Sequence, residues 1–144
     1  KMIRERVPAG ATILTDQSTR NVLDYYLARD TLNHSRDLGG GYLEFQLNDY
    51  RVISIPKFHF FMYDLRTDWD TFQRALGSSA TDRLWVVYFG FEVEDAKPDN
   101  VFRLFPPGDL IVRYTHQDNQ VMQLQFRPPP TSRGEQTAVA VPSR

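Results

Sequence analysis

The sequence contains no cysteine, which removes several kinds of chemistry from consideration. A disulfide, a thiolate nucleophile and a cysteine-ligated metal are all excluded. A dominant charge of one sign is lacking too, because 17 basic and 18 acidic residues are interspersed and give a net charge of −1. A nucleic-acid interface needs a basic face or stripe, so we do not expect nucleic acid as a partner.

Long hydrophobic runs are also absent. The longest, Leu84 to Phe91, is far shorter than the roughly 20 apolar residues with which a helix crosses a bilayer. No signal peptide is visible, because Met2 already lies in a charged, helical pattern. We therefore expect the chain to be a piece of a longer protein.

Catalytic and metal-binding motifs are scarce. No Gly-x-Ser-x-Gly elbow occurs. The run Gly39-Gly40-Gly41 matches neither phosphate-binding glycine pattern, and we interpret it as a flexible turn. His34, His59 and His116 are too widely spaced to form a local metal-binding pair, and His59 is interpreted as a hydrogen-bonded, partly buried side chain. The sequence predicts no catalytic residue, no metal ligand and no cofactor.

The stretch from Ala11 to Arg29 is the best organised part of the chain. A short apolar strand ending at Thr15 leads through a polar turn into an amphipathic helix, which is half of a β-α-β unit. Ligands of open α/β sheets bind at the carboxyl ends of strands, and a helix start can hold an anion. The candidate ligand-binding residues are therefore Asp16, Gln17, Ser18 and Thr19. Helix capping is the alternative role for these residue types.

The remaining patterns predict further elements on both sides of this unit. Helices are expected over Lys1–Val7 and Thr67–Gly77, the second with a capping pair at Thr67 and Asp70. Strands are expected over Tyr42–Leu47, Arg51–Ile55, Leu84–Phe91, Val101–Phe105, Leu110–Tyr114 and Val121–Arg127. Loops are expected over Asp30–Gly41 and Glu92–Asn100. The stretch Phe58–Tyr63 fits either a strand continuation or a buried loop.

Because strands alternate with helices, parallel pairing with right-handed crossovers is favoured. We predict a single α/β domain over residues 1–127, with a mixed, mostly parallel sheet, flanking helices and a C-terminal antiparallel hairpin. Residues 128–144 are Pro-rich and polar, and we interpret them as a flexible tail. Pairing of Thr137 to Val141 with a neighbouring chain, and hence a dimer through the tail, is left open.

Aromatic residues make up 13% of the chain, which is more than a small core needs. One interpretation is an aromatic-rich core, since each ring buries a large area. The other is an exposed patch that docks on membrane-embedded protein or on lipid headgroups.

The opening residues resemble the start of a known kind of domain. The residues that carry the resemblance are Ile3, Arg4, Val7, Pro8, Gly10, Ala11, Ile13, Asp16, Tyr25, Tyr26 and Leu27. They are similar to the soluble C-terminal domain of large bacterial membrane glycosyltransferases of the GT-C type. This group includes relatives of the dolichyl-phosphate-mannose protein mannosyltransferases and of the lipid A aminoarabinose transferases. The strand at Leu84–Phe91 with its acidic loop also looks similar.

The resemblance implies an accessory role, because the catalytic carboxylates of that family lie in loops of the membrane part, which this chain lacks. The expected function is a non-catalytic extracytoplasmic domain of a polyprenyl-phosphate-sugar-dependent glycosyltransferase, at the periplasmic face of the bacterial inner membrane. Its expected partners are the membrane-embedded part of the same polypeptide and the polyprenyl-phosphate sugar donor or the acceptor. Two alternatives stay open: a stand-alone α/β protein that binds a nucleotide-like ligand at Asp16 to Thr19, and a protein-interaction module.

Overall fold

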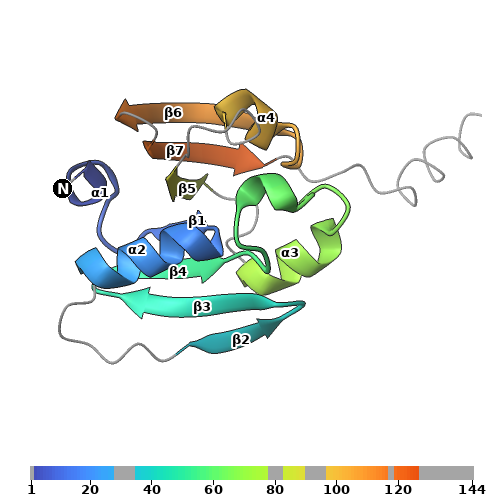
Figure 1. The fold of residues 1–144 in the computed structure, drawn as a ribbon, viewed down its shortest axis with the longest axis horizontal. Helices are drawn as coiled ribbons and strands as arrows, with labels where there is room; N and C mark the ends of the chain where they lie inside the picture. The colour runs from blue at the N-terminus through green and yellow to red at the C-terminus, as the bar shows by residue number, and fades with distance from the viewer. Residues whose placement is uncertain (1, 28–34, 78–82, 90–96, 117–118, 127–144) are drawn as a thin grey trace, which may run out of the picture.

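The computed structural model describes residues 2–27, 35–77, 83–89, 97–116 and 119–126 (Figure 1). The predicted tail at 128–144 lies outside the described residues. In chain order the elements are α1 (Met2–Arg6), β1 (Thr12–Thr15), α2 (Gln17–Leu27), β2 (Arg36–Gly39), β3 (Tyr42–Leu47), β4 (Tyr50–Ser54), the 3-10 turn η1 (Phe60–Met62), α3 (Trp69–Leu76), β5 (Arg83–Phe89), α4 (Pro98–Phe102), β6 (Gly108–His116) and β7 (Asn119–Phe126).

The strands form one seven-stranded sheet in the order β2-β3-β4-β1-β5-β7-β6. β1 is parallel to both β4 and β5, whereas β2-β3, β3-β4, β5-β7 and β7-β6 are antiparallel pairs. The mixed α/β sheet and the C-terminal hairpin are confirmed, but the prediction of a mostly parallel sheet is wrong. Each parallel pair needs a long crossover, whereas β2, β3 and β4 follow one another through two-residue turns, which join antiparallel strands.

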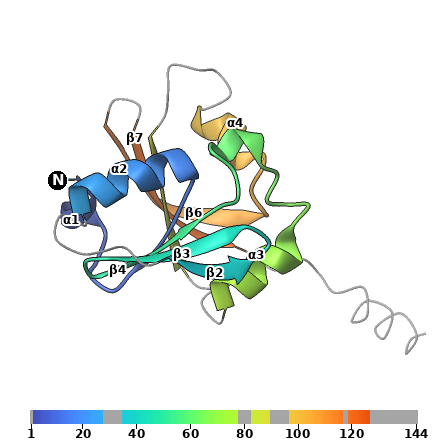
Figure 2. The same ribbon diagram turned by 60° about the horizontal axis from the view of Figure 1, so that its bottom comes forward.

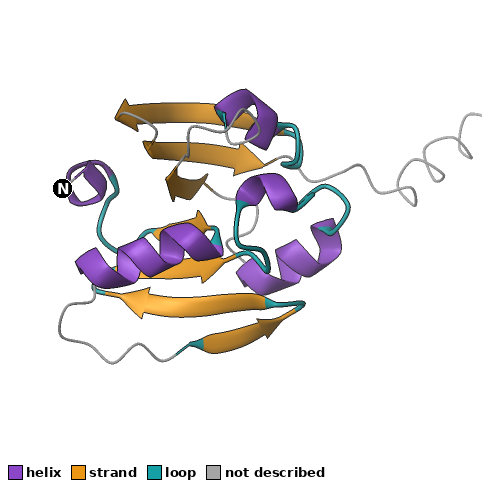
Figure 3. Ribbon diagram, viewed as in Figure 1, coloured by secondary structure: helices purple, strands orange, loops and turns teal. Residues whose placement is uncertain are grey.

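Helices pack against this sheet (Figure 3), and Figure 2 shows α2 and α3 on opposite sides of it. On one face, α1 and α2 pack on residues that include Ile13, Val52 and Val87. On the other face, η1, α3 and α4 pack on residues that include Leu14 and Val86. Neighbouring residues of β1 and β5 therefore face opposite layers, as the two-residue period of a strand requires. The prediction that β5 is covered on both faces is confirmed.

Two predicted segments differ in the structure. The stretch Val101–Phe105 is not a strand: it overlaps α4, whose first residue is Pro98, a residue whose fixed φ suits the first helical turn. Val101 and Phe105 are buried while Arg103 between them is exposed, so the burial does not follow the two-residue period of a strand. The stretch expected as a polar loop before Tyr42 contains β2, an edge strand with mostly exposed residues and so no apolar alternation.

The helix α3 is confirmed, but its start differs from the predicted capping pair. The N-cap residue is Asp68, and its side chain makes no capping hydrogen bond. Gly77 follows the helix with a φ of 70°, a conformation that favours glycine. The ambiguous stretch Phe58–Tyr63 contains η1, whose residue Phe60 is buried.

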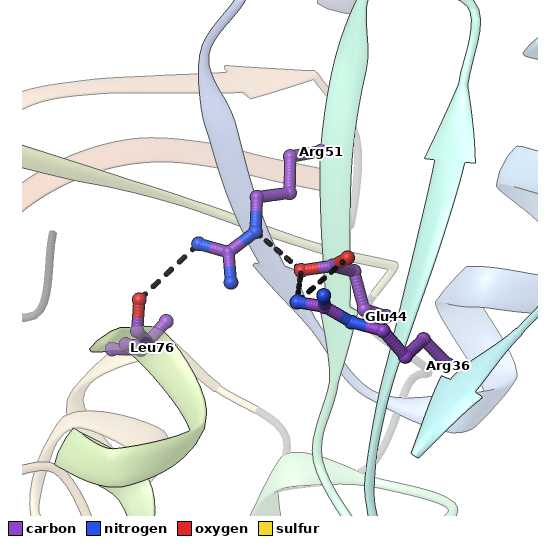
Figure 4. Close-up of polar contacts among 4 residues, drawn as sticks. All are labelled: Arg36, Glu44, Arg51 and Leu76. Atoms are coloured by element: carbon purple, nitrogen blue, oxygen red, sulfur yellow. Dashed lines mark hydrogen bonds and ion pairs between the residues drawn. The ribbon is translucent and has the colours of Figure 1, made fainter. Parts of the chain in front are cut away.

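An arginine fixes the end of α3 to the sheet (Figure 4). The Arg51 side chain on β4 donates from Nη1 to the carbonyl oxygen of Leu76 at 3.2 Å. Its Nε lies 2.5 Å from Oε2 of Glu44 on β3, and Nη2 of Arg36 on β2 is 3.3 Å from the same carboxylate. Three strands and the C-terminus of α3 are thus joined by one charged cluster.

Candidate functional site

The candidate residues lie where β1 and β4 end side by side. The two strands are parallel, with Thr15 paired to Ser54. After β1 the chain enters α2 on one face of the sheet, and after β4 it enters η1 and α3 on the other face. Adjacent parallel strands whose connections leave on opposite faces form a topological switch point, the usual ligand position in open α/β sheets.

Asp16 is buried at this point, with 2% of its surface exposed. Its Oδ1 accepts hydrogen bonds from the backbone N–H of Thr19 at 2.8 Å and from the hydroxyl of Ser18 at 3.0 Å. Its Oδ2 accepts from the backbone N–H of Phe60 at 3.2 Å. The carboxylate therefore caps α2 and also ties η1 to the helix start.

The N–H groups of the first turn of α2 all have partners inside the protein. Those of Gln17 and Ser18 donate to the carbonyl oxygens of Lys57 and Phe58, at 3.2 and 3.0 Å. That of Thr19 donates to Asp16. An anion at this helix start would have to displace these bonds, because binding of an anion needs the same N–H groups.

Two threonines bind this region to β5. The hydroxyl of Thr15 donates to the carbonyl oxygen of Val87 at 2.9 Å, and the Thr19 hydroxyl accepts from the N–H of Phe89 at 3.0 Å. Both threonines are fully buried. The structure thus brings all four sequence-predicted site residues together at the predicted place, with Asp16 and Thr19 engaged in internal bonds.

Ser18 also lies against His59, with 3.2 Å between its Oγ and Nδ1 of the ring. Because the Ser18 proton goes to Asp16, the geometry assigns the donor to Nδ1 and the acceptor to the serine oxygen. A catalytic triad needs the histidine between the carboxylate and the serine. Here the serine is in the middle, so this contact positions the ring and does not activate a nucleophile.

The His59 ring lies between two aromatic neighbours, 4.6 Å from the Phe58 centroid and 5.1 Å from that of Phe61. Phe58 and Met62 on the same segment are 51% and 55% exposed. The expectation of a hydrogen-bonded, partly buried His59 is confirmed. Sequence reasoning noticed the aromatic run but had no signal for which of its rings are exposed.

A hollow of about 500 Å³ adjoins this segment and was not predicted from the sequence. It is lined by Phe61, Arg66, Asn100, Arg103 and Leu104. Its two walls, η1 with the following loop and α4 with its C-terminal turn, are distant in sequence, so no local pattern indicates it. Two larger hollows, of about 930 and 610 Å³, flank α1 and include Glu5 and Arg6 in their linings.

A chain of hydroxyl groups lies at the start of α3. Tyr42 donates to the Tyr63 hydroxyl at 3.1 Å, and Tyr63 donates to Oδ2 of Asp68. Burial, together with the bond to Asp68, raises the pKa of Tyr63 to about 12. Burial and the bond to Tyr63 raise the pKa of Tyr42 as well. Both phenols are therefore protonated at neutral pH, and the bonds hold the β3 end against α3.

The described residues contain no group of three or more metal-ligating side chains close enough to hold an ion. Among the helices of the same residues, none has the length and apolar character needed to cross a membrane.

Comparison of the chain with family models, with curated proteins and with solved structures finds no match.

Proposed function

We propose that this chain is a non-catalytic accessory domain of a polyprenyl-phosphate-sugar-dependent membrane glycosyltransferase, acting at the extracytoplasmic face of the membrane. In this proposal the membrane-embedded part of the same polypeptide carries the reaction. The domain covers that part or helps to position the sugar donor or the acceptor. The resemblance of the residues from Ile3 to Leu27 supports this choice of parent protein.

The observation that carries the proposal is the rigid docking of α1. Ile3 and Val7 are 8% and 2% exposed and lie in the same core cluster as Ile13. The Tyr50 hydroxyl donates to the carbonyl oxygen of Val7 at 3.1 Å, and the N–H of Gly10 donates to Asp49 at 2.9 Å. A membrane span that leads into α1 would therefore hold the domain in a fixed orientation, as a covering domain requires.

The occupied helix start supports a non-catalytic role. The N–H groups of Gln17, Ser18 and Thr19 and the carboxylate of Asp16 already bind within the chain. This arrangement speaks against the alternative of a nucleotide-binding protein that uses these residues. The exposed Phe58 and Met62 favour the other alternative, a protein-interaction surface, which is compatible with docking on a membrane-embedded part.

The proposal is tested on the intact polypeptide in membranes. We expect apolar, membrane-spanning segments to be encoded immediately ahead of Lys1, and a start codon at that point would refute the proposal. Deletion of residues 1–144 should abolish sugar transfer from a polyprenyl-phosphate donor, while the isolated chain should transfer none.

A flexible linker tests the rigid docking. About ten Gly and Ser residues inserted ahead of Met2 should reduce transfer, because such a linker behaves as a random coil. The same linker added after Arg144 is the matched control and should leave transfer unchanged. Equal sugar transfer by the two variants would show that a fixed orientation of the domain is not needed.

A further inference from the structure

The hollow between η1 and α4 has fixed walls. Figures 1 and 2 both show α4 beside the green turn that contains η1. The rings of Phe60 in η1 and Phe105 after α4 pack edge to face with centroids 5.3 Å apart, and Phe105 also contacts Phe102. A side chain that lines this hollow therefore projects from a packed base, which lowers the entropic cost of holding a ligand.

The charged side chains that line the hollow are positive. Its lining contains two guanidinium groups, from Arg66 and Arg103, and no carboxylate. In the two hollows beside α1 the arginines are accompanied by Glu5, and in the larger one also by Asp49. Although the chain as a whole has a net charge of −1, the η1–α4 hollow is therefore positively charged and can attract an anion.

The two arginines differ in what already binds them. Asp64 accepts from Nε and Nη2 of Arg66 at 2.9 and 2.8 Å, which fixes that guanidinium and neutralises it. Arg103 is exposed and forms no ion pair within the described part of the chain. Arg103 is therefore the cation available to an anionic ligand, and the planar guanidinium fits a phosphate with two parallel hydrogen bonds.

Besides the two arginines and Asn100, the lining of the hollow is apolar. Phe61 and Leu104 line the hollow, and two exposed apolar side chains, Phe58 and Met62, flank Phe61 in the sequence. Inorganic phosphate would leave these side chains in water, whereas a phosphate ester with a hydrocarbon chain would bury them. The combination of an available guanidinium at Arg103 with the apolar lining residues Phe61 and Leu104 matches an amphiphilic phosphate.

We propose that the η1–α4 hollow binds a polyprenyl phosphate, with the phosphate at Arg103 and the start of the hydrocarbon chain on Phe61 and Met62. The choice of a polyprenyl chain rests on the proposed function. The site would hold the lipid-linked donor, or the lipid phosphate released from it, next to the membrane-embedded part.

The test uses the 144-residue chain and four probes. Geranyl phosphate represents the proposed ligand, geraniol lacks the phosphate, inorganic phosphate lacks the chain, and a short-chain phosphatidic acid carries a phosphate on a different lipid. Calorimetric titration should show binding of geranyl phosphate that is several-fold tighter than that of the other three and that weakens as salt is raised. A thermal shift of several degrees should accompany saturation.

Two variants locate the site. Arg103→Gln should weaken geranyl phosphate binding about tenfold, since a charge-assisted hydrogen bond is lost. Arg74→Gln removes the same charge from an exposed arginine on α3 and should bind like the wild type. Met62→Gln should weaken geranyl phosphate binding but leave the binding of inorganic phosphate unchanged.

Several outcomes would overturn the proposal. Equal effects of Arg103→Gln and Arg74→Gln on geranyl phosphate binding would show that the phosphate does not bind at Arg103. If inorganic phosphate bound as tightly as geranyl phosphate, the apolar side chains would not contribute to binding. If phosphatidic acid bound as tightly or more tightly, the assignment of a polyprenyl chain would be refuted. A failure here leaves the accessory role intact, because that role is measured by sugar transfer. Conversely, transfer that survives deletion of the domain would refute the accessory role and leave a measured phosphate site standing.

Discussion

Asp16→Ala separates a capping role from a ligand-binding role at the end of β1. The carboxylate accepts from Thr19, Ser18 and Phe60, and its removal leaves two buried N–H groups without a partner. Loss of an N-cap costs about 1 kcal/mol. The N–H of Phe60, left buried without an acceptor, adds about 1–3 kcal/mol. We expect the free energy of unfolding to fall by about 2–4 kcal/mol.

The assay is equilibrium unfolding in urea, followed by tryptophan fluorescence. Trp69 and Trp85 are 8% and 6% exposed and lie in the two different core clusters, so both layers are observed. The midpoint should fall while the slope m stays unchanged. For a domain of this size, about 3 °C of melting temperature per kcal/mol is expected, hence a loss of about 6–12 °C.

Two substitutions serve as controls. Asp16→Asn keeps an oxygen that accepts a capping hydrogen bond and should lose only about 1 kcal/mol. Ser18→Ala removes one hydroxyl and should cost about 0.5–1.5 kcal/mol. The reasoning is refuted if Asp16→Ala stays within about 0.5 kcal/mol of the wild type. If that stable variant also lost a thermal shift with a nucleotide, the ligand-binding alternative would replace the capping role.

Three further predictions concern other contacts. Arg51→Ala should cost about 1–2 kcal/mol because it frees the end of α3, whereas Arg36→Ala, with a side chain 68% exposed, should cost under about 0.5 kcal/mol in the same unfolding assay. Gly41→Ala should cost about 1–3 kcal/mol more than Gly39→Ala: both residues have positive φ, but only at Gly41 would the new Cβ meet another residue, 2.6 Å from Cβ of Pro56. The pKa of Tyr63 is raised to about 12 in the folded state, so its contribution to stability is complete below pH 10 and is lost as pH rises from about 10 to about 12. Melting temperatures measured over that range should fall less steeply in Tyr63→Phe, and parallel curves would contradict the assignment.

Local patterns determined most of the elements. The apolar run from Leu84 indicated a strand buried on both faces, and Gly77 correctly ended α3. The polar residues after Thr15 correctly indicated the turn between β1 and α2. Each of these features depends on residues that are close in sequence, so side-chain period, cap and turn chemistry suffice to indicate it.

Local patterns failed where the same kind of residues can form either a helix or a strand. The stretch around Val101 is short and apolar, and only the fold shows that Arg103 is exposed between the buried Val101 and Phe105, which does not fit the two-residue period of a strand. The edge strand β2 is exposed and so carries no alternation of apolar residues. Whether the strands pair in parallel depends on which strands meet, and a propensity for strand does not specify the partner.

The sequence by itself determined that this chain is an α/β domain with a polar helix start at the end of β1. Only the tertiary structure decided what that start does, because the partners of Asp16 and Ser18 include Phe60 and His59, more than 40 residues away. The same holds for the η1–α4 hollow, which places Arg66 beside Arg103. Contacts between distant segments depend on how whole elements pack, and that information is spread over the entire core instead of residing in any one stretch.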